Sequence, residues 1–487
     1  MLFDLSNPSG GRPAPGHDVC IAGAGPAGIV LALSLAEKGL RVLLLEGGGL
    51  DDAGEASDSY QLEQPDSAIR YAAEASRRRY FGGTTAHWGG WSVPFSEIDF
   101  EARGPLPGWP IGFSDLAKHY PRASEFCEIN IDTFEPSTLG NEHTIFEHEG
   151  QGFRNQWFGF SPPTRFGQRY RDEIVGSESI DLLIHANVVG IEHSDGVVKA
   201  LEVRSLDGQA FRASAAQHVL AMGGIECTRL LLAASKDQPI LGNRGDWLGY
   251  GFMDHYGYRP GWLLSDARLS YFRVETPAGP TMPVLTPDPD LLREFDLNNF
   301  CIMSTPVRPD DTLGRHYGDS RVLGLPGEQI ARHRLQMVCE PTPTRASRIS
   351  LSNEQDALGL PRVQLAWHID DWDIAYINRA SDQLARWVGA MGIGRMQRSA
   401  PLDDEGRRSR NATFHHMGTT RMSDSAETGV VDGHCRVFDT ENLFVASSSV
   451  FPRGGFANPT ISIVALSLRL AEHLASQQHQ EQTSHAA

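Results

Sequence analysis

One segment, residues 18–49, constrains the fold more than any other, and it reads DVCIAGAGPAGIVLALSLAEKGLRVLLLEGGG. Its apolar run at 18–22 is typical of a buried parallel strand. A helical stretch at 26–38 follows, with proline near its start and glycine at its end. A second apolar run occupies 41–45. The segment therefore predicts a complete β-α-β unit.

Three glycines follow the first strand in a GxGxxG pattern. Gly23 permits a tight turn, Gly25 lets the backbone approach a pyrophosphate, and Gly28 lets helix and strand pack closely. Ala27 falls in the first helical turn, whose free N–H groups and partial positive charge favour phosphate. Glu46, at the end of the second strand, can accept a hydrogen bond from a ribose hydroxyl and disfavours a 2′-phosphate. The unit predicts a dinucleotide site, although an unrelated Gly-rich turn has the same spacing, and it does not decide between FAD and NAD.

The charge balance limits the classes of partner. The 487 residues include 43 basic and 61 acidic residues, a formal net charge of −18. Nucleic-acid binding requires Lys and Arg to displace counterions, so we expect no nucleic-acid partner. We interpret the acidic surface as favouring solubility. The length predicts two interleaved domains.

The cysteines and the N-terminal residues predict a cytoplasmic protein. The six cysteines form no CxxC pair and no regular spacing, which is typical of a reduced intracellular protein. The first residues lack the charged and apolar regions of a secretory signal. No run of 18 apolar residues is present, so no transmembrane segment is expected.

A second structured block lies at residues 183–233. Its alternating strands are separated by Asp195-Gly196 and Asp207-Gly208, which are favourable hairpin turns. The stretch VLAMGG then ends a buried strand and precedes a helix. This pattern predicts a three-stranded β-meander that leads into a last parallel strand. Further strands are expected near 347–352 and 362–368.

Six stretches of the sequence resemble one known family when they are taken in order. They are GAGPAG with Glu46, GGTTAHWGG, HVLAMGGIECTRLLL, LGYGFMDH, HHMGTTRM and NLFVASSSVFPRGGFANPTISIVALSLRLAEHL. Together they resemble the glucose-methanol-choline (GMC) oxidoreductases, in the branch that holds pyranose oxidase and fructose dehydrogenase large subunits. The resemblance is strong at both ends and weak across 100–180 and 256–340. It implies FAD rather than NAD.

The resemblance also implies a domain organisation. The fold is expected to be α/β, or α+β over the whole chain, with a Rossmann-like FAD-binding domain carrying the β-meander and a substrate domain with an antiparallel sheet. The FAD-binding domain is expected to comprise residues 18–100, 183–255 and 401–475. The substrate domain is expected to comprise residues 101–182 and 256–400. A flexible lead-in at 1–17 and a disordered tail at 476–487 complete the chain.

The stretch FHHMGTTRM allows three interpretations when it is considered alone. Its adjacent histidines could bind a metal, pack structurally, or take a proton from an alcohol. Metal pairs favour His at i and i+4 or the HExxH pattern, and neither is present, so no metal is expected. The resemblance implies the third interpretation for one of the two histidines.

In the family, the catalytic base is a His just before a Gly-Thr turn, and Gly418-Thr419 places that role on His415. The second catalytic position, a His or Asn, falls on Asn458, whose neutral amide could hold the substrate oxygen. An ordinary histidine pKa near 6.5 suits a base near neutrality. We expect a structural or supporting role for His416.

The stretch GGTTAHWGG is expected to line the flavin. Gly82, Gly83 and Thr84 would give close backbone approach to the cofactor. His87 falls on the position that carries covalent FAD in pyranose oxidase, and Trp88 follows it. Because Ala86 stands where that enzyme has Thr, we expect non-covalent FAD and keep a covalent link through His87 as the alternative.

Four further residues are implied as cofactor contacts. Val188 could contact adenine through its backbone, and Ser448 could contribute a backbone N–H near the pyrophosphate. Pro459 and Thr460 suit the first turn of a helix whose N-terminus could face the flavin pyrimidine ring. The arginines at 77–79 are interpreted as a solvated charge run, with contact to the pyrophosphate as the alternative.

The sequence thus predicts an FAD-dependent oxidoreductase that oxidises a CH–OH group of a sugar, glycoside or polyol, with His415 as base and hydride transfer to flavin N5. The alternatives are a related flavoprotein acting on a non-sugar alcohol, and a non-redox lyase with structural FAD. The electron acceptor is left open between oxygen, a quinone and a cytochrome, which includes an electron-transfer complex at a membrane.

Overall fold

The structure is a computed structural model that describes residues 1–52, 60–69, 72, 76–136, 152–235, 241–265, 269, 271–306, 331–402 and 413–486. Parts of the predicted substrate domain and C-terminal block, at 137–151, 307–330 and 403–412, lie outside the described residues.

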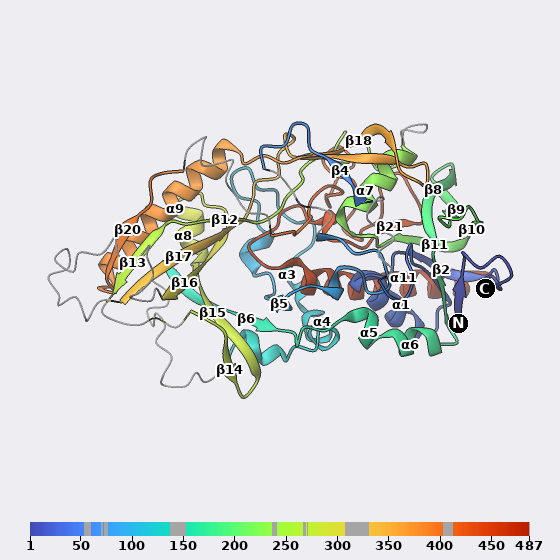
Figure 1. The fold of residues 1–487 in the computed structure, drawn as a ribbon, viewed down its shortest axis with the longest axis horizontal. Helices are drawn as coiled ribbons and strands as arrows, with labels where there is room; N and C mark the ends of the chain where they lie inside the picture. Colours follow the sequence, from blue (N-terminus) through green and yellow to red (C-terminus); the bar gives the residue numbers. More distant parts are fainter. Residues whose placement is uncertain are drawn as a thin grey trace.

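A six-stranded parallel sheet forms one end of the molecule (Figure 1). Its order is β1 (Leu2–Asp4), β7 (Ile180–Ile184), β3 (Val42–Leu45), β2 (His17–Ala22), β11 (Ala215–Leu220) and β21 (Leu443–Val445). All its pairings are parallel, and the inner strands β2 and β3 are apolar and almost wholly buried. Such burial is what a sheet with both faces covered requires.

The predicted β-α-β unit is present with boundaries within one residue of those expected. It consists of β2, α1 (Pro26–Glu37) and β3. The long C-terminal helix α11 (Pro459–Ala486) packs along α1. Short helices add to this end of the molecule: α3 (Phe113–Ala117), α4 (Tyr120–Phe126), α5 (Phe166–Arg169) and α6 (Arg171–Gly176).

The predicted β-meander is also present. It consists of β8 (Asn187–Ser194), β9 (Val197–Arg204) and β10 (Ala210–Ala213). Asp195 and Gly196 both have positive φ, 52° and 78°, as a type I′ hairpin turn requires. The meander leads into β11 and then α7 (Gly223–Ala234). The strand β11 is not the last of the parallel sheet, because β21 from the C-terminal block pairs beside it.

Three predicted boundaries are wrong. The lead-in at 1–17 is not a loose segment, because β1 pairs in parallel with β7. The strand β7 crosses the expected domain boundary at 182, since its apolar residues complete the parallel sheet. The tail at 476–486 is not disordered, because α11 continues to Ala486; its Gln-rich sequence contains no Gly or Pro, the residues that most disfavour a helix.

The expected antiparallel sheet forms the opposite end of the molecule (Figure 1). Its main order is β20 (Arg395–Arg398), β13 (Gly261–Ser265), β17 (Ala331–Cys339), β16 (Phe300–Pro306), β15 (Gly279–Pro287), β6 (Phe153–Phe160) and β5 (Trp91–Ser92). Two further strands join it, β12 (Tyr256–Tyr258) on β17 and β14 (Val274–Thr276) on β15. The helix α9 (Asp371–Ala390) packs on this sheet, and Trp387 meets Phe153 with ring centroids 5.1 Å apart. The short helix α8 (Pro289–Glu294) follows β15.

A small fourth sheet lies beside α7. It contains the two strands expected near 347–352 and 362–368, as β18 (Arg348–Gln355) and β19 (Pro361–Ala366), with β4 (Leu62–Glu63). Four 3₁₀ turns complete the described elements that matter here: η2 (Gly83–Ala86), η3 (Glu97–Phe100), η4 (Ile131–Phe134) and η7 (Ser448–Val450). The hydrophobic core has two parts, one around the parallel sheet and one between α9 and the antiparallel sheet.

All six cysteines are buried and none forms a disulfide. Within the described residues, no helix combines the length and the apolar character needed to cross a membrane.

Candidate active site

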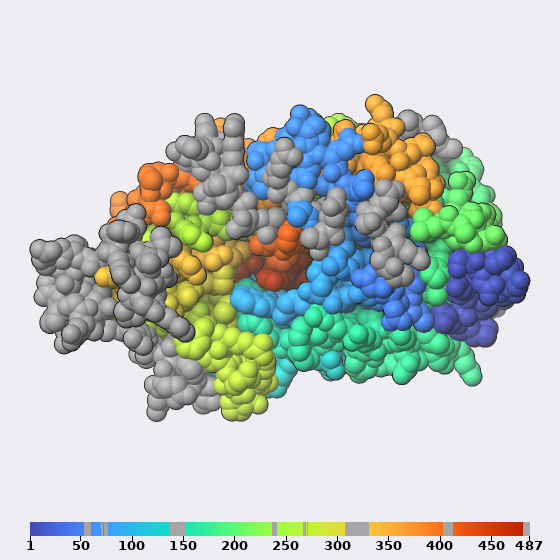
Figure 2. Space-filling view, viewed as in Figure 1, coloured from blue at the N-terminus to red at the C-terminus, as the bar shows by residue number. Residues whose placement is uncertain are grey.

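A cavity of about 640 Å³ extends from the carboxyl ends of the parallel strands to the antiparallel sheet. Open α/β sheets bind ligands at this edge. Figure 2 shows part of the C-terminal block, coloured orange-red, at the bottom of a hollow near the middle of the molecule. Most of the residues expected at the site line the cavity: Gly23, Gly25, Ala27, Glu46, Gly83, Thr84, His87, Trp88, Val188, His415, Ser448, Asn458, Pro459 and Thr460.

The two remaining expected residues, Gly28 and Gly82, lie behind the cavity wall. A Cβ on Gly28 would stand 1.9 Å from the carbonyl oxygen of Gly23, so the close approach of α1 to the β2 turn requires glycine. Gly82 has φ of 100°, and its N–H donates to Ala24 at 2.8 Å. Gly82 thus joins the GGTTAHWGG turn to the first glycine turn instead of touching the cavity.

The dinucleotide end of the cavity comprises residues 23–27 and Glu46. A Cβ on Gly25 would have no atom within 4 Å, so the backbone at the start of α1 is open to the cavity. The first turn of α1 has no acidic residue and no side-chain cap. Its N–H groups and positive partial charge are therefore available to a phosphate.

Glu46 is buried, and its carboxylate is held by the backbone. Its Oε2 accepts from Ala24 at 3.1 Å and its Oε1 from Gly48 at 2.9 Å. Burial raises the pKa of Glu46, opposed by these two hydrogen bonds and by the charge of Arg79. Each oxygen keeps a further lone pair, so the carboxylate is positioned and can still accept a ribose hydroxyl.

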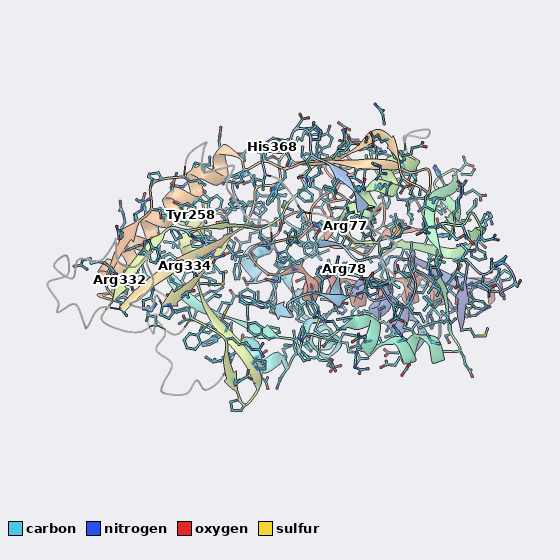
Figure 3. All side chains as sticks on the ribbon, in the orientation of Figure 1. Arg77, Arg78, Tyr258, Arg332, Arg334 and His368 are labelled. Carbon is cyan, nitrogen blue, oxygen red and sulfur yellow. The ribbon has the colours of Figure 1, made fainter. Side chains whose placement is uncertain are left out.

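The interpretation of residues 77–79 as a solvated charge run is wrong. All three arginines line the cavity, and Figure 3 shows Arg77 and Arg78 near the centre of the molecule. Arg77 is buried, ion-paired to Glu226 at 2.6 Å, and lies over the Tyr60 ring. Sequence alone could not show this, because Glu226 lies 149 positions away in α7.

The GGTTAHWGG turn places His87 and Trp88 on the cavity wall. Burial lowers the pKa of His87, and the charges of Arg78 and Arg165 act in the same direction. The indole N–H of Trp88 donates to the Thr164 carbonyl at 2.8 Å, which fixes that ring. A neutral His87 at the wall suits contact with an aromatic cofactor.

Two chain segments pair antiparallel at the other end of the cavity. Met253 and Met417 form a two-way backbone bridge, with N–H to carbonyl distances of 3.0 Å in both directions. This register sets His255 opposite His415. Beside them, Asp254 accepts the backbone N–H groups of Phe414 and His415, each at 2.9 Å.

The imidazole of His415 has two partners, both at Nδ1. His255 Nδ1 lies at 2.9 Å and Thr413 Oγ1 at 3.0 Å. Among the described residues, Nε2 of His415 has no hydrogen-bond partner, and the residue lines the cavity. Burial holds the pKa of His415 well below its usual range, and His255 and His416 act in the same direction. The ring is therefore neutral near pH 7.

His416 is held differently from its neighbour. Its carbonyl accepts from Ser448 Oγ at 2.6 Å, and its Nε2 lies 3.4 Å from Ser76 Oγ. Burial lowers the pKa of His416 to about 3, with a further contribution from Arg77. A Cβ on Gly224 would stand 2.7 Å from the His416 carbonyl oxygen, so the residue is wedged against α7. These contacts support the structural role expected for it.

Asn458 directly precedes α11, and Pro459 and Thr460 form the first turn of that helix as expected. All three residues line the cavity. The positive partial charge of the α11 N-terminus therefore faces the cavity from the side that also carries Asn458.

The antiparallel sheet supplies residues that the sequence interpretation did not assign. Met303 of β16 and Gln336 and Val338 of β17 line the cavity, as does Trp91 of β5. His255 and Asp254 were also missed, although LGYGFMDH was recognised as a family stretch. The sequence signal for them was the Asp-His pair within that stretch, which gave no partner for either side chain.

The residues at the dinucleotide end fit FAD. The open backbone at Gly25 and the uncapped first turn of α1 suit a pyrophosphate, and the acceptor oxygens of Glu46 suit a ribose. The same cavity is lined by His87 and by a second helix N-terminus at Pro459, which suits a longer cofactor with an aromatic ring system. Among the described residues, no group of three or more metal-ligating side chains comes together.

Comparison with known proteins identifies related sequences. Residues 343–467 match the family model described as GMC oxidoreductase. The chain is 24% identical to fructose dehydrogenase large subunit from Gluconobacter japonicus, over 93% of this chain and 97% of that protein. It is also 24% identical to 2-methyl-1,2-propanediol dehydrogenase from Mycolicibacterium austroafricanum, over 94% of this chain and 95% of that protein.

A solved structure shows the same fold. Pyridoxine 4-oxidase from Mesorbium loti is 18% identical, with a TM-score of 0.56 over 94% of this chain and 99% of that one. The chain thus carries the C-terminal domain of the GMC oxidoreductases, which confirms the resemblance drawn from its motifs. The expectation of an oxidoreductase is confirmed with it.

Proposed function

We propose that the protein oxidises a CH–OH group of a sugar, glycoside or polyol to a carbonyl, with His415 as the base. The observation that carries this proposal is the state of the His415 ring. It is neutral, it is held at Nδ1 by His255 and Thr413, and its Nε2 is left for the cavity. A neutral imidazole nitrogen of this kind can take a proton from an alcohol.

The chain's own residues would divide the work at the reacting carbon. His415 accepts the hydroxyl proton at Nε2, and the Asn458 amide orients the substrate oxygen without competing for that proton. The N-terminus of α11 stabilises negative charge developing in front of it. FAD, held at the dinucleotide end, supplies a hydride acceptor for the carbon.

Two features support a polyol or sugar as the substrate. The antiparallel-sheet wall combines Gln336, which can exchange hydrogen bonds with a hydroxyl, and Trp91, an exposed aromatic residue that lines the cavity. The relatives point the same way, since one is named for fructose and the other for a diol. A simple diol would make this a non-sugar alcohol enzyme, which is the second candidate.

The acceptor of the second half-reaction stays open between oxygen, a quinone and a cytochrome. Six buried cysteines, none of them in a disulfide, support a reducing compartment, and we infer a cytoplasmic location on that ground.

Anaerobic reduction of the bound flavin by substrate tests the proposal. The purified protein is mixed with a panel of sugars, glycosides, polyols and simple alcohols, and loss of the flavin absorbance is followed in time. His415→Ala is expected to slow the reduction by ~10²–10⁴, the usual contribution of a general base. His193→Ala, in the β8–β9 hairpin far from the cavity, is the matched histidine control and should behave as the wild type.

The pH profile gives a second check on His415. The base works only when it is neutral, and burial lowers its pKa well below 6.5. The reduction rate should therefore stay constant as pH falls through 6.5 and decline only at lower pH. A flavin that no alcohol reduces would shift the interpretation to the non-redox lyase. Full activity in His415→Ala would remove His415 as the base.

A further inference from the structure

We infer that His255 is a positioning residue that locks His415 in the Nδ1–H tautomer, so that Nε2 is the nitrogen that takes the proton. This inference rests on the proposed function of His415. It follows from the hydrogen bonds of His255, which determine first where the proton of the His255 ring lies and then where the proton of the His415 ring lies.

The first step is the proton on Nε2 of His255. That atom lies 2.8 Å from the carbonyl oxygen of Gly455 and 3.4 Å from that of Gly454. A carbonyl oxygen only accepts hydrogen bonds, so Nε2 must carry a hydrogen. A deprotonated Nε2 would direct its lone pair at two carbonyl oxygens.

The second step is the state of Nδ1 of His255. The residue is fully buried, and burial lowers its pKa to about 4, against the opposing effects of the two carbonyl hydrogen bonds and of Glu340. A neutral imidazole with hydrogen on Nε2 has a lone pair on Nδ1. His255 therefore accepts at Nδ1.

The third step transfers this constraint to His415. The two Nδ1 atoms are 2.9 Å apart, so the hydrogen between them belongs to His415. The hydroxyl of Thr413 is consistent with this, because it donates to Asp254 Oδ1 at 2.6 Å and leaves its oxygen as an acceptor 3.0 Å from the same N–H. With hydrogen on Nδ1, the neutral ring of His415 keeps its lone pair on Nε2.

The charged and titratable groups around the pair do not disturb this assignment. Asp254 is committed to the Thr413 hydroxyl and to two backbone N–H groups. Glu340 is paired to Arg453 through two hydrogen bonds of 2.9 and 2.7 Å. His416 is neutral because burial lowers its pKa.

The fold links the same chain of hydrogen bonds to Asn458. Gly455, whose carbonyl receives His255, lies three residues before Asn458, and its N–H donates to Glu340 at 2.8 Å. Both polar groups of Gly455 are thus hydrogen-bonded. Its φ of 53° is left-handed, a conformation that glycine adopts readily. One carbonyl thus couples the tautomer of the base to the loop that carries its catalytic partner.

Two substitutions separate the bonds that His255 makes. His255→Asn places an amide oxygen near the Nδ1 position and keeps an acceptor for His415, while the donor to Gly455 is lost. His255→Gln places the amide near the Nε2 position and keeps a donor for Gly455, while the acceptor for His415 is lost. We expect flavin reduction to slow by about 10- to 10²-fold in His255→Gln and by only a few-fold in His255→Asn, both less than loss of the base itself.

The tautomer itself is measured on the FAD-loaded protein with ¹⁵N-histidine labelling. The His415 signals are assigned by their absence in His415→Gln. We expect one protonated nitrogen at Nδ1 and one unprotonated nitrogen at Nε2 in the wild type, and a mixture of tautomers in His255→Gln. Thermal unfolding of both variants establishes that each is folded.

The outcomes distinguish this inference from the proposed function. A wild-type His415 protonated at Nε2, or a reversed order with His255→Asn the slower variant, would overturn the tautomer assignment. In that case the effect of His415→Ala on flavin reduction still decides separately whether His415 is the base.

Discussion

The two ends of the cavity are built in opposite ways. The dinucleotide end is formed by neighbouring residues, since 23–28 supply the turn, the open backbone and the helix N-terminus. The histidine end contains His255, His415, His416 and Asn458. It joins His255 to His415, 160 positions away, and to Gly455, 200 positions away. The dinucleotide end depends on glycines, which have no side chain. The histidine end depends on buried polar side chains that must form hydrogen bonds with each other.

The electrostatics of the two ends also differ, because one end depends on backbone groups and the other on charged side chains. At the dinucleotide end, the backbone of α1 offers uncapped N–H groups to a ligand. The histidine end stands on a buried ion pair, because Arg453 and Glu340 are both 0% exposed and Glu340 holds the N–H of Gly455. We therefore expect the dinucleotide end to be disrupted by substitutions that add a side chain, and the histidine end by substitutions that remove a charge or a hydrogen bond.

Removing one charge of the buried pair is expected to have the largest effect. Burial acts to raise the pKa of Glu340, but Arg453 outweighs it and holds the pKa below its usual value, so the carboxylate is ionised at neutral pH. Glu340→Gln leaves the buried Arg453 charge without its ion-pair partner and should lower the free energy of unfolding by about 3–5 kcal/mol. Denaturant unfolding measures this loss.

The matched control is Glu101→Gln. Glu101 forms an exposed ion pair with Arg293 at 2.6 Å, and only its backbone carbonyl contacts Arg453. Loss of an exposed pair should cost less than about 1 kcal/mol. Equal costs for the two variants would contradict the view that the histidine end depends on its buried charges.

A methyl group added at either of two glycines tests the dinucleotide end. In Gly28→Ala the new Cβ would meet the Gly23 carbonyl at 1.9 Å, so the strand-helix packing should lose about 1–3 kcal/mol even without cofactor. In Gly25→Ala the new Cβ meets no protein atom within 4 Å. That variant should fold normally and retain FAD poorly, because the methyl group enters the space of the cofactor.

The two glycine variants serve as controls for each other. Unfolding of the cofactor-free proteins measures the packing cost, and flavin absorbance per protein after desalting measures retention. A destabilised Gly25→Ala, or a Gly28→Ala as stable as the wild type, would show that the two glycines do not have the separate roles assigned to them.

The difference between the two ends also explains what sequence could predict. The β2-α1-β3 unit and the hairpin at Asp195-Gly196 follow from spacing and turn chemistry within about 30 residues, and both are present. His415 and Asn458 have no such local signal. They were placed by resemblance, and the structure brings both to one cavity.

Partnerships across the chain could not be predicted in this way. The burial of Arg77 depends on Glu226 in α7, and the proton on His415 depends on His255 from another segment. The lead-in became a strand because β7, far along the sequence, offered an edge for pairing. A charge run, a lone histidine and a polar N-terminus each look solvent-exposed until their partners are known.

The smallest effect is expected at the antiparallel-sheet wall, at Gln336 of β17. This side chain lines the cavity away from the dinucleotide end and belongs to neither the histidine pair nor the buried ion pair. If it binds a substrate hydroxyl equally in the ground and transition states, Gln336→Ala should raise KM by about 2- to 10-fold, the worth of one hydrogen bond, with kcat nearly unchanged.

Gln209→Ala, in the turn between β9 and β10, serves as the control and should leave KM unchanged. Steady-state kinetics with the best substrate of the panel measures both constants, and flavin content should equal that of the wild type. A fall in kcat with constant KM would instead place Gln336 in contact with the reacting group, and the histidine end would then extend onto the sheet.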